Sequence, residues 1–304
     1  RRQRKMCIRD RYLIELIELH NLKKFPKVLM LSGKKGIGKF TLVNHFLNYI
    51  FSKNDKNPYN FKEKLINKNS VFYNQVMKQT SQDIFFIKAE QNKNIRIEDI
   101  RNLKSTISQT SLSVNPRFVI IDEVEFLNDN SVNALLKSLE APSTNIFYIL
   151  INNKQTELIK TISSRCFITN IFLNINENVL IINYLLKENN INPILEYNFD
   201  LTPGLFITFN EIFFRLNIDK KDKILVKMSK LLNAYKKDKE KIMINVIIYV
   251  IDQYFFELIN LNEKKLDFLL NIKTSIIKNI NDFTYYNLNI NSVLNSIEMK
   301  LNNV

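Results

Sequence analysis

Cysteine is nearly absent from this chain of 304 residues, which contains only Cys7 and Cys166. Two thiols cannot build a disulfide framework or a four-thiolate metal site, the usual devices of small secreted domains and zinc modules. A reducing compartment fits this usage, so we expect a cytoplasmic protein. We interpret Cys166 as a small buried residue and not as a reactive thiol.

Glycine and proline are also scarce, with four and six copies in the whole chain. Few tight turns and few helix breakers follow from this, so we expect long helices. Three of the four glycines, Gly33, Gly36 and Gly38, lie in one short stretch. A residue type so rare and so concentrated indicates that this stretch needs a special backbone shape.

Long apolar runs are missing as well, since none approaches the roughly 18 residues of a membrane-spanning helix. The best candidate, residues 242–251, is short and is interrupted by Asn245, so we interpret it as a buried helix. The basic start of the chain is followed by Glu15 and Glu18, where a signal peptide needs an apolar region. We therefore expect a protein that is not secreted.

Negative charge is in the minority, because 44 Lys and Arg face 30 Asp and Glu, for a formal net charge of +14. Residues 1–11 hold six of the basic residues and one acidic residue, and we set them apart from the fold as an artefact or a disordered end. The remaining charge of +9 favours a polyanionic partner such as DNA. A solubilising surface in a Lys- and Asn-rich protein explains it equally well.

The first half of the chain alternates short apolar runs with helical patterns, which predicts an α/β fold with a parallel sheet and crossover helices. Each run is rich in β-branched or aromatic residues and is bounded by turn or capping residues. We expect strands at residues 27–31, 83–89, 117–122, 145–151 and 166–172, and helices at residues 39–51, 97–108 and 130–140. The intervening residues 52–82 show no clear period and are expected to form a long connection.

Beyond residue 173 the strand signal fades and helical periodicity takes over, with one helix expected at residues 176–189. From about residue 211 onward, successive amphipathic stretches predict an all-helical domain. We therefore divide the chain into an α/β domain at residues 12–173, a small helical domain at 174–210 and a helical domain at 211–304.

The stretch at residues 33–40 follows an apolar run and precedes a helical pattern, the context in which a phosphate-binding loop is expected. Glycines let backbone amides turn inward, the helix start adds partial positive charge, and Lys39 would reach the outer phosphates. A glycine turn with an exposed lysine is the alternative. The candidate nucleotide-binding residues are Gly33, Gly36, Gly38, Lys39 and Thr41.

One position departs from the motif G-x-x-x-x-G-K-[ST], because Phe40 stands where a hydroxyl normally ligates the magnesium ion that bridges the outer phosphates. Thr41 does not replace it, since the next residue along a helix points roughly 100° away. We therefore expect weak binding of ATP or ADP, and we expect neither a working magnesium site nor productive hydrolysis.

A second motif is the apolar run at residues 118–127, which leads into two carboxylates, Asp122 and Glu123. In a Walker B arrangement the first carboxylate holds the metal through water and the second orients an attacking water. Acidic residues that form an ordinary loop are the alternative interpretation.

A third motif is KTISSRCFI at residues 160–168, in which Arg165 stands at the entrance to a strand. From there it could project toward a neighbouring subunit, and an arginine supplied in trans to another protomer's ATP is worth roughly 10³ to 10⁵ in rate. A surface arginine in a solvated ion pair is the alternative.

Four stretches occur in the order and spacing of bacterial clamp-loader subunits of the AAA+ family, which the chain resembles. They are GKKGIGKFTLV, IRIEDIRNL, VIIDEVEFLNDNSVNALLKSLEAP and TISSRC. The NALLKSLE helix followed by proline and then by S-R-C is the specific part. The resemblance covers about residues 27–172 and continues faintly into LTPGLFITF at residues 201–209.

Within that family the chain is more similar to the delta-prime subunits of DNA polymerase III than to the ATP-hydrolysing gamma/tau subunits. Phe40 occupies the magnesium position, Leu205 stands where the motor subunit's lid places a sensor arginine, and no long tau-like extension follows. Asp122 and Glu123 are retained although a typical delta-prime can lose them, so nucleotide binding stays open.

The resemblance implies an AAA+ domain with a five-stranded parallel sheet and helices on both faces, a helical lid and a helical collar that joins five subunits in a ring. The implied partners are gamma/tau and delta subunits, the sliding clamp, and primed DNA reached through the complex. Arg165, in the S-R-C motif, is implied to reach the ATP of the adjacent gamma subunit. Zinc is not expected, because residues 52–82 lack the four cysteines of the family's zinc module.

Two other functions stay open at this point. An ATP-hydrolysing gamma-like motor subunit, or another AAA+ ATPase, would use Lys39, Asp122 and Glu123 to hydrolyse ATP in place. A general basic DNA-binding helical protein would instead bind DNA tightly and with a strong dependence on salt.

Overall fold

The computed structural model describes residues 7–78, 80–89, 94–108, 116–197, 201–261 and 265–302. The chain divides into two compact units. Unit 1 combines Arg1–Ile191 with Tyr197–Ile207, and unit 2 combines Asn192–Glu196 with Thr208–Val304. Helix α8 (Pro203–Arg215) continues through residues 210 and 211, between which the sequence predicted a boundary.

Unit 1 is built on a sheet of five parallel strands in the order β2-β3-β4-β1-β5. The strands are β1 (Val28–Ser32), β2 (Ile84–Lys88), β3 (Arg117–Asp122), β4 (Ile146–Asn152) and β5 (Phe167–Asn170). Each lies inside, or within one residue of, the apolar run that predicted it. The α/β fold with a parallel five-stranded sheet is therefore confirmed.

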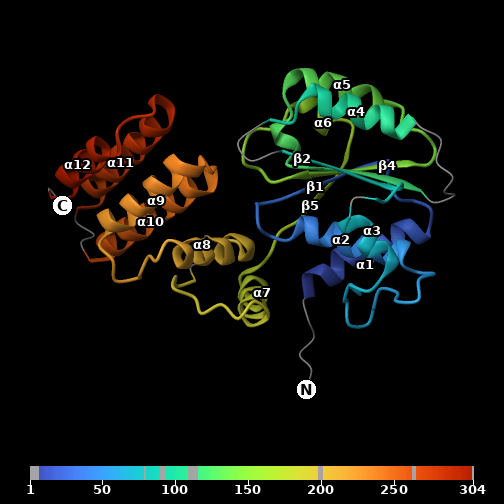
Figure 1. Ribbon diagram of the computed structural model, residues 1–304, viewed down its shortest axis with the longest axis horizontal. Coiled ribbons are helices and arrows are strands. Elements are labelled where there is room, and N and C mark those ends of the chain that lie inside the picture. Colours follow the sequence, from blue (N-terminus) through green and yellow to red (C-terminus); the bar gives the residue numbers. More distant parts are fainter. Residues whose placement is uncertain are drawn as a thin grey trace. The chain divides into compact units, whose positions relative to one another are not determined.

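Helices cover both faces of this sheet, as Figure 1 shows. One face carries α1 (Cys7–Asn21), α2 (Lys39–Phe51) and α3 (Val71–Met77). The other face carries α4 (Ile97–Ser108), α5 (Asp129–Glu140) and α6 (Lys160–Ser163). A short 3-10 turn, η1 (Val124–Phe126), follows β3, and α7 (Ile175–Glu188) follows β5.

The two faces of the sheet bury alternate residues of the same strands, as the two-residue period of a strand requires. In β3, Phe118 and Ile120 belong to the core under α1 and α2, whereas Val119 and Ile121 belong to the core under α4 and α5. All four side chains are fully buried. Strands that are buried on both faces read as continuous apolar runs, and this is the pattern in the sequence.

Phe118 is the centre of an aromatic cluster in the first of these cores. Its ring stacks on Phe147 at a centroid distance of 5.3 Å. It meets the rings of Phe25, Phe46 and Phe51 edge-on at 5.9, 5.9 and 6.0 Å. Both geometries are favourable for aromatic pairs, so this residue joins β3 to β4, to α2 and to the segment before β1.

The connection expected at residues 52–82 contains a helix, α3, that the sequence did not reveal. The Ser70 hydroxyl caps α3 by accepting a hydrogen bond from the Tyr73 amide at 3.2 Å. Earlier in the segment, Tyr59 is buried and its hydroxyl lies 2.8 Å from His45 Nδ1. So short a helix offers too few apolar positions for a periodic signal.

In the part that the structure describes, the regular elements of unit 2 are all helices. After α8 come α9 (Ile224–Asp238), α10 (Lys241–Leu261), α11 (Leu266–Tyr286) and α12 (Ile290–Leu301). Helix α10 packs against α9 and α11, and α12 packs against the same two helices. The all-helical C-terminal region expected from the periodicity is confirmed.

Helix α10 is long and apolar enough to cross a membrane, by length and composition alone. The central helix of a folded bundle meets the same criteria. In α10 the side chains of Met243, Val246, Ile247 and Ile251 are fully buried within the chain. This burial agrees with the interpretation of the segment around Asn245 as a core helix.

Replacing Phe118 with Ala should lower the free energy of unfolding of unit 1 by about 3–5 kcal/mol, because the cavity removes contacts with four other rings. Urea unfolding followed by circular dichroism measures this change. Phe172→Ala is the matched control, since Phe172 is 64% exposed. Equal losses of stability for the two variants would show that Phe118 is not a centre of the core.

Candidate functional site

Parallel strands bring their carboxyl ends to one edge of a sheet, and two of the motifs found in the sequence follow strands of this sheet. Residues 33–38, which we call the glycine loop, follow β1, Asp122 ends β3, and Asn152 ends β4, which lies between them. The register pairs Ser32 with Asn152 and Asp122 with Ile151. One edge therefore gathers the loop, the carboxylates and a strand-end amide.

The glycine loop uses its glycines for two different reasons. Gly36 and Gly38 have φ of 84° and 92°, in the left-handed region that side chains disfavour. Gly33 is needed for close packing, because a Cβ at this position would lie 2.3 Å from the carbonyl oxygen of Ile171. The sequence predicted that this stretch needs an unusual backbone shape. The structure shows that Gly36 and Gly38 supply positive φ angles and that Gly33 allows close packing.

Lys39 begins α2, and its side chain folds back on the loop. Its ammonium group donates to the carbonyl oxygens of Gly33 at 2.6 Å and of Lys34 at 2.8 Å. The residue is only 3% exposed. Burial lowers the pKa of Lys39 to about 8, and the nearby carboxylates of Glu125 and Asp122 oppose this effect. A poorly hydrated cation at the start of a helix is suited to an anion such as phosphate.

Phe40 offers no ligand to a metal ion. Its side chain is exposed, and its ring lies 5.7 Å from the ring of Phe86 on β2. Thr41, the next residue of α2, is half-buried. Because magnesium takes oxygen ligands, the residue after Lys39 does not fit a magnesium ion held in the manner of the family.

The two carboxylates at the end of β3 already have protein partners. Asp122 Oδ1 accepts hydrogen bonds from the Glu123 amide at 3.0 Å and from Asn153 Nδ2 at 3.4 Å, and Lys88 Nζ lies 3.6 Å from Asp122 Oδ2. Glu123 adopts a left-handed φ of 60°, and its Oε1 accepts from Lys35 Nζ at 2.7 Å. The loop and the strand end are thus joined by a direct ion pair.

Sequence reasoning missed Lys35, Glu125 and Asn153 as members of this site. Glu125 is buried, and its two carboxylate oxygens accept from the Asn153 amide at 3.1 and 3.2 Å. Two asparagines at the end of an apolar run are a signal that the sequence did contain. The pairing of Lys35 with Glu123 could not be read from it, because the two residues are 88 positions apart.

Arg165 lies apart from these residues and follows the short helix α6. Its Nε donates to Glu140 Oε1 at 2.8 Å, its Nη2 lies 2.6 Å from the same oxygen, and its Nη1 donates to the Thr161 carbonyl oxygen at 2.9 Å. About a third of the side chain, 34%, stays exposed. The structure therefore brings Lys39 and the carboxylates of β3 together, while the contacts of Arg165 lie with α5 and α6.

Cys166, the next residue, behaves as a packing residue. It is half-buried, and its thiol donates to the Ile162 carbonyl oxygen at 3.1 Å. Burial raises the pKa of the Cys166 thiol to about 12. A thiol that stays protonated at neutral pH is a poor nucleophile.

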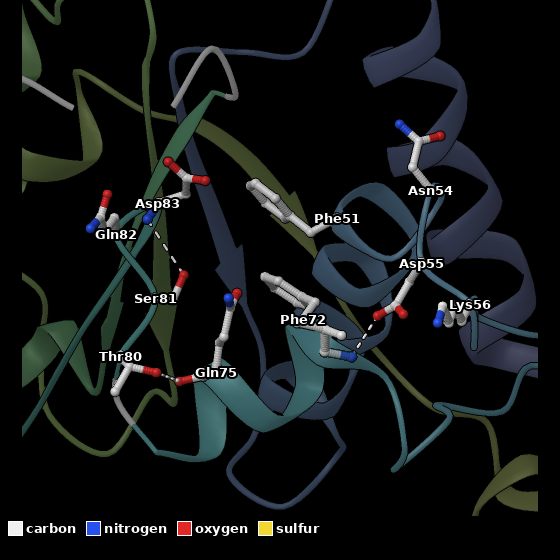
Figure 2. A pocket seen from close by; sticks show the side chains of 11 residues that line it. Phe51, Asn54, Asp55, Lys56, Phe72, Gln75, Thr80, Ser81, Gln82 and Asp83 are labelled. Carbon is white, nitrogen blue, oxygen red and sulfur yellow. Dashed lines mark hydrogen bonds between the residues drawn. The ribbon is translucent and has the colours of Figure 1, made fainter. Parts of the chain in front are cut away.

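A cavity of about 800 Å³ opens elsewhere in unit 1, beside α3 and the start of β2 (Figure 2). Figure 2 shows the rings of Phe51 and Phe72 side by side in it, and their centroids are 4.9 Å apart. At its rim the Asp55 carboxylate accepts a hydrogen bond from the Val71 amide at 2.5 Å. The residues that line this cavity include none of the site residues predicted from the sequence.

Comparison with known proteins relates this sequence to subunits of DNA polymerase III. The family model described as "DNA polymerase III, delta subunit" matches residues 9–173, more than half of the chain. A DNA polymerase III subunit delta' of Pseudomonas aeruginosa is 38% identical over 88 residues, which are 29% of this chain and 27% of that protein. The subunit delta' of Buchnera aphidicola subsp. Baizongia pistaciae is 28% identical over 184 residues, or 59% of this chain and 52% of the relative.

These alignments span between about a quarter and about a half of the length of the curated relatives. Among solved structures, a DNA polymerase III gamma subunit-related protein from Thermotoga maritima is similar with a TM-score of 0.49 at 18% sequence identity. That comparison covers 93% of this chain and 96% of the other.

The lowered pKa of Lys39 predicts a specific dependence of stability on pH. The folded pKa is about 8 and the reference value is 10.5, so between these values the unfolded chain holds more protons than the folded one. The unfolding free energy of the wild type, measured relative to Lys39→Met, should therefore rise with pH across this window and be flat below it. Chemical denaturation at several pH values measures this difference.

Lys62→Met is the control for this experiment, because Lys62 is exposed in the connection before α3. The difference in unfolding free energy between the wild type and Lys62→Met should not change over the same range of pH. A flat difference for Lys39→Met would mean that the Lys39 ammonium is well hydrated in the folded protein.

Proposed function

Since this chain belongs to the DNA polymerase III delta-prime subunit family, we propose that it is a delta-prime-like subunit of a bacterial clamp loader in the cytoplasm. In this role it assembles with gamma/tau and delta subunits in a ring and helps to load the sliding clamp on primed DNA. The helices of unit 2 form the collar through which it joins the ring. Arg165 acts in trans on the ATP of the adjacent subunit.

The family match over residues 9–173 is the observation that carries this proposal. It spans the glycine loop, the carboxylates at the end of β3, and Arg165. The first two parts form the chain's own proposed nucleotide site. Arg165 is the part proposed to act on the site of the neighbouring subunit.

Three observations favour a subunit that does not hydrolyse ATP over an ATP-hydrolysing motor subunit. Phe40 supplies no magnesium ligand. Glu123, which would have to orient an attacking water, is instead bonded to Lys35 at 2.7 Å. Asp122 is bonded to Asn153 and lies near Lys88. Hydrolysis in this pocket would require these pairs to separate, so we assign the chain weak nucleotide binding and little or no turnover of its own.

The surroundings of Arg165 support its role as a trans arginine finger. Glu140 and the Thr161 carbonyl oxygen hold the guanidinium group while 34% of the side chain stays exposed. An exposed ion pair contributes little to stability, typically less than about 1 kcal/mol. A triphosphate carries more negative charge than Glu140, so Arg165 can exchange one partner for the other at low cost.

Assembly is the test of the clamp-loader role. The purified chain should form a stable complex with the delta and gamma/tau subunits of its own organism in size-exclusion chromatography and native mass spectrometry. On its own it should show little or no ATP turnover. A chain that ignores these subunits, and hydrolyses ATP at a rate that Lys39→Ala abolishes, would support the motor alternative instead.

Arg165→Ala should leave the complex assembled but lower its DNA-stimulated ATPase, because one of its ATP sites loses an arginine worth roughly 10³ to 10⁵ in rate. Steady-state ATPase of the reconstituted complex measures the loss. Arg165→Lys should restore only part of it, since lysine keeps the charge but not the planar pair of donors.

Arg101→Ala is the matched control, because Arg101 is an exposed arginine on α4, in the same unit as Arg165. It should leave the ATPase unchanged. An Arg165→Ala complex with wild-type ATPase would rule out the arginine-finger assignment while leaving the assembly result intact.

A further inference from the structure

Residues 285–288, which we call the tyrosine turn, join α11 to α12 and expose two neighbouring aromatic side chains. Tyr285 is 82% exposed and Tyr286 is 66% exposed, and their rings meet edge-on at a centroid distance of 4.8 Å. Leu288, in the same turn, is exposed as well. Single exposed apolar side chains are ordinary, whereas neighbouring ones mark an interaction site.

The tyrosine turn is fixed by packing and by helix caps. Phe283 is buried at the end of α11, and its ring lies 5.9 Å from the ring of Tyr235 on α9. Asn287 ends α11 with a left-handed φ of 52°, and the Asn289 side chain starts α12 by accepting from the Asn291 amide at 2.8 Å. A ligand therefore meets side chains that stand on ordered backbone, which lowers the entropic cost of binding.

The end of α9 brings lysines to the tyrosine turn. Helices α9, α11 and α12 belong to one helical bundle in unit 2 (Figure 1). Lys239, at the cap of α9, donates from Nζ to Asn287 Oδ1 at 3.2 Å. Lys236 and Lys237 lie in the last turn of α9, just before this contact, and both are exposed.

Positive charge outweighs negative charge at this end of α9. Residues 236–241 contain four lysines against Asp238 and Glu240. Glu240 Oε2 lies 3.6 Å from Arg215 Nη2, so the charge of this carboxylate is largely compensated. The net charge of the chain allowed either a polyanionic partner or a solubilising surface. Lysines beside exposed aromatic rings favour the polyanion, because a solubilising surface has no use for such rings.

The combination of rings and lysines also indicates which polyanion fits. Lysines bind phosphates of any nucleic acid, whereas aromatic side chains stack on the faces of unpaired bases. A duplex keeps its base faces inside its own stack, and only a single strand offers them to a protein. Single-stranded DNA and single-stranded RNA share this chemistry.

We propose that the tyrosine turn and the end of α9 form a binding site for single-stranded nucleic acid. Bases stack on Tyr285 and Tyr286, while Lys236 and Lys237 bind the phosphates of the same strand. This site goes beyond the proposed clamp-loader role, in which primed DNA is reached through the complex. It depends neither on nucleotide binding by unit 1 nor on assembly with other subunits.

The test uses the full chain and a labelled oligothymidylate of about 15 nucleotides, the upper end of known single-strand sites. Fluorescence anisotropy at low salt measures the affinity. Tyr285→Ala and Tyr286→Ala should each weaken binding by roughly 5- to 150-fold, the range for one lost stacking contact. Both side chains are exposed, so their removal leaves the helical bundle folded, which circular dichroism verifies.

The dependence of binding on salt tests the lysines separately. A variant with both Lys236→Gln and Lys237→Gln should have a shallower slope of log affinity against log salt concentration. The slope should fall by about 1.4, since each phosphate contact to a single strand contributes about 0.7. An unchanged slope would overturn the assignment of these lysines.

Phe268→Ala and Lys265→Gln are the matched controls. Phe268 is 46% exposed and Lys265 is exposed, and both lie at the start of α11. The length of this helix places them about 30 Å from the tyrosine turn. Both variants should bind as the wild type does. Tyrosine variants that bind as tightly as Phe268→Ala would overturn the site, as would a wild type that fails to bind at about 10⁻⁴ M. The exposed tyrosines would then be left to a protein partner.

Two further probes separate the kinds of nucleic acid. An oligouridylate of equal length distinguishes RNA from DNA, and tyrosine-dependent binding of either strand supports the site. A duplex of equal length should bind more weakly than the single strand. Duplex binding that is equally tight and insensitive to the tyrosine variants would mean that charge alone acts, and it would overturn the site. Assembly with clamp-loader subunits, measured separately, can fail or succeed whatever the outcome here.

Discussion

Close approach of backbone to backbone around the glycine loop is the constraint on which the site depends. All four glycines of the chain serve it: Gly33 lies against the Ile171 carbonyl oxygen, Gly36 and Gly204 lie against each other, and Gly38 supplies a left-handed turn into α2. A side chain at any of the first three would push apart segments that the sheet and its helices hold in place. The scarcity of glycine elsewhere fits a fold made of long helices and buried parallel strands, where glycine is a liability.

The charges at the carboxyl edge of the sheet are arranged so that they satisfy one another. Lys35 bonds Glu123, Asn153 bonds Asp122 and Glu125, and Lys39 bonds loop carbonyls. A catalytic pocket leaves its charged groups free to bind substrate. Here these charged groups would have to give up a protein partner before they could bind a substrate. Arg165 is not part of this network, and its carboxylate partner is Glu140 on α5.

Most of the fold of unit 1 could be predicted because its signals are local. Strands buried on both faces are continuous apolar runs, and α2 and α4 begin and end at the residues the pattern indicated. Helix α3 was missed because it is short and Phe72 is its one buried residue. The site was predicted in part: the loop, Lys39, Asp122 and Glu123 do meet at one edge, whereas the pairing of Glu123 with Lys35 and the role of Asn153 depend on which strands are neighbours.

The sequence by itself determined the class of fold and the place of the glycine loop, since each of these follows from residue types within a few positions of one another. Only the tertiary structure decided which distant segment packs against the loop. Thr202 and Gly204 lie more than 160 positions from the carbonyl groups they bind. The physical reason is that hydrogen bonds and van der Waals contacts act over a few ångströms in space, and no local pattern of residues records which distant segment of backbone will occupy that space.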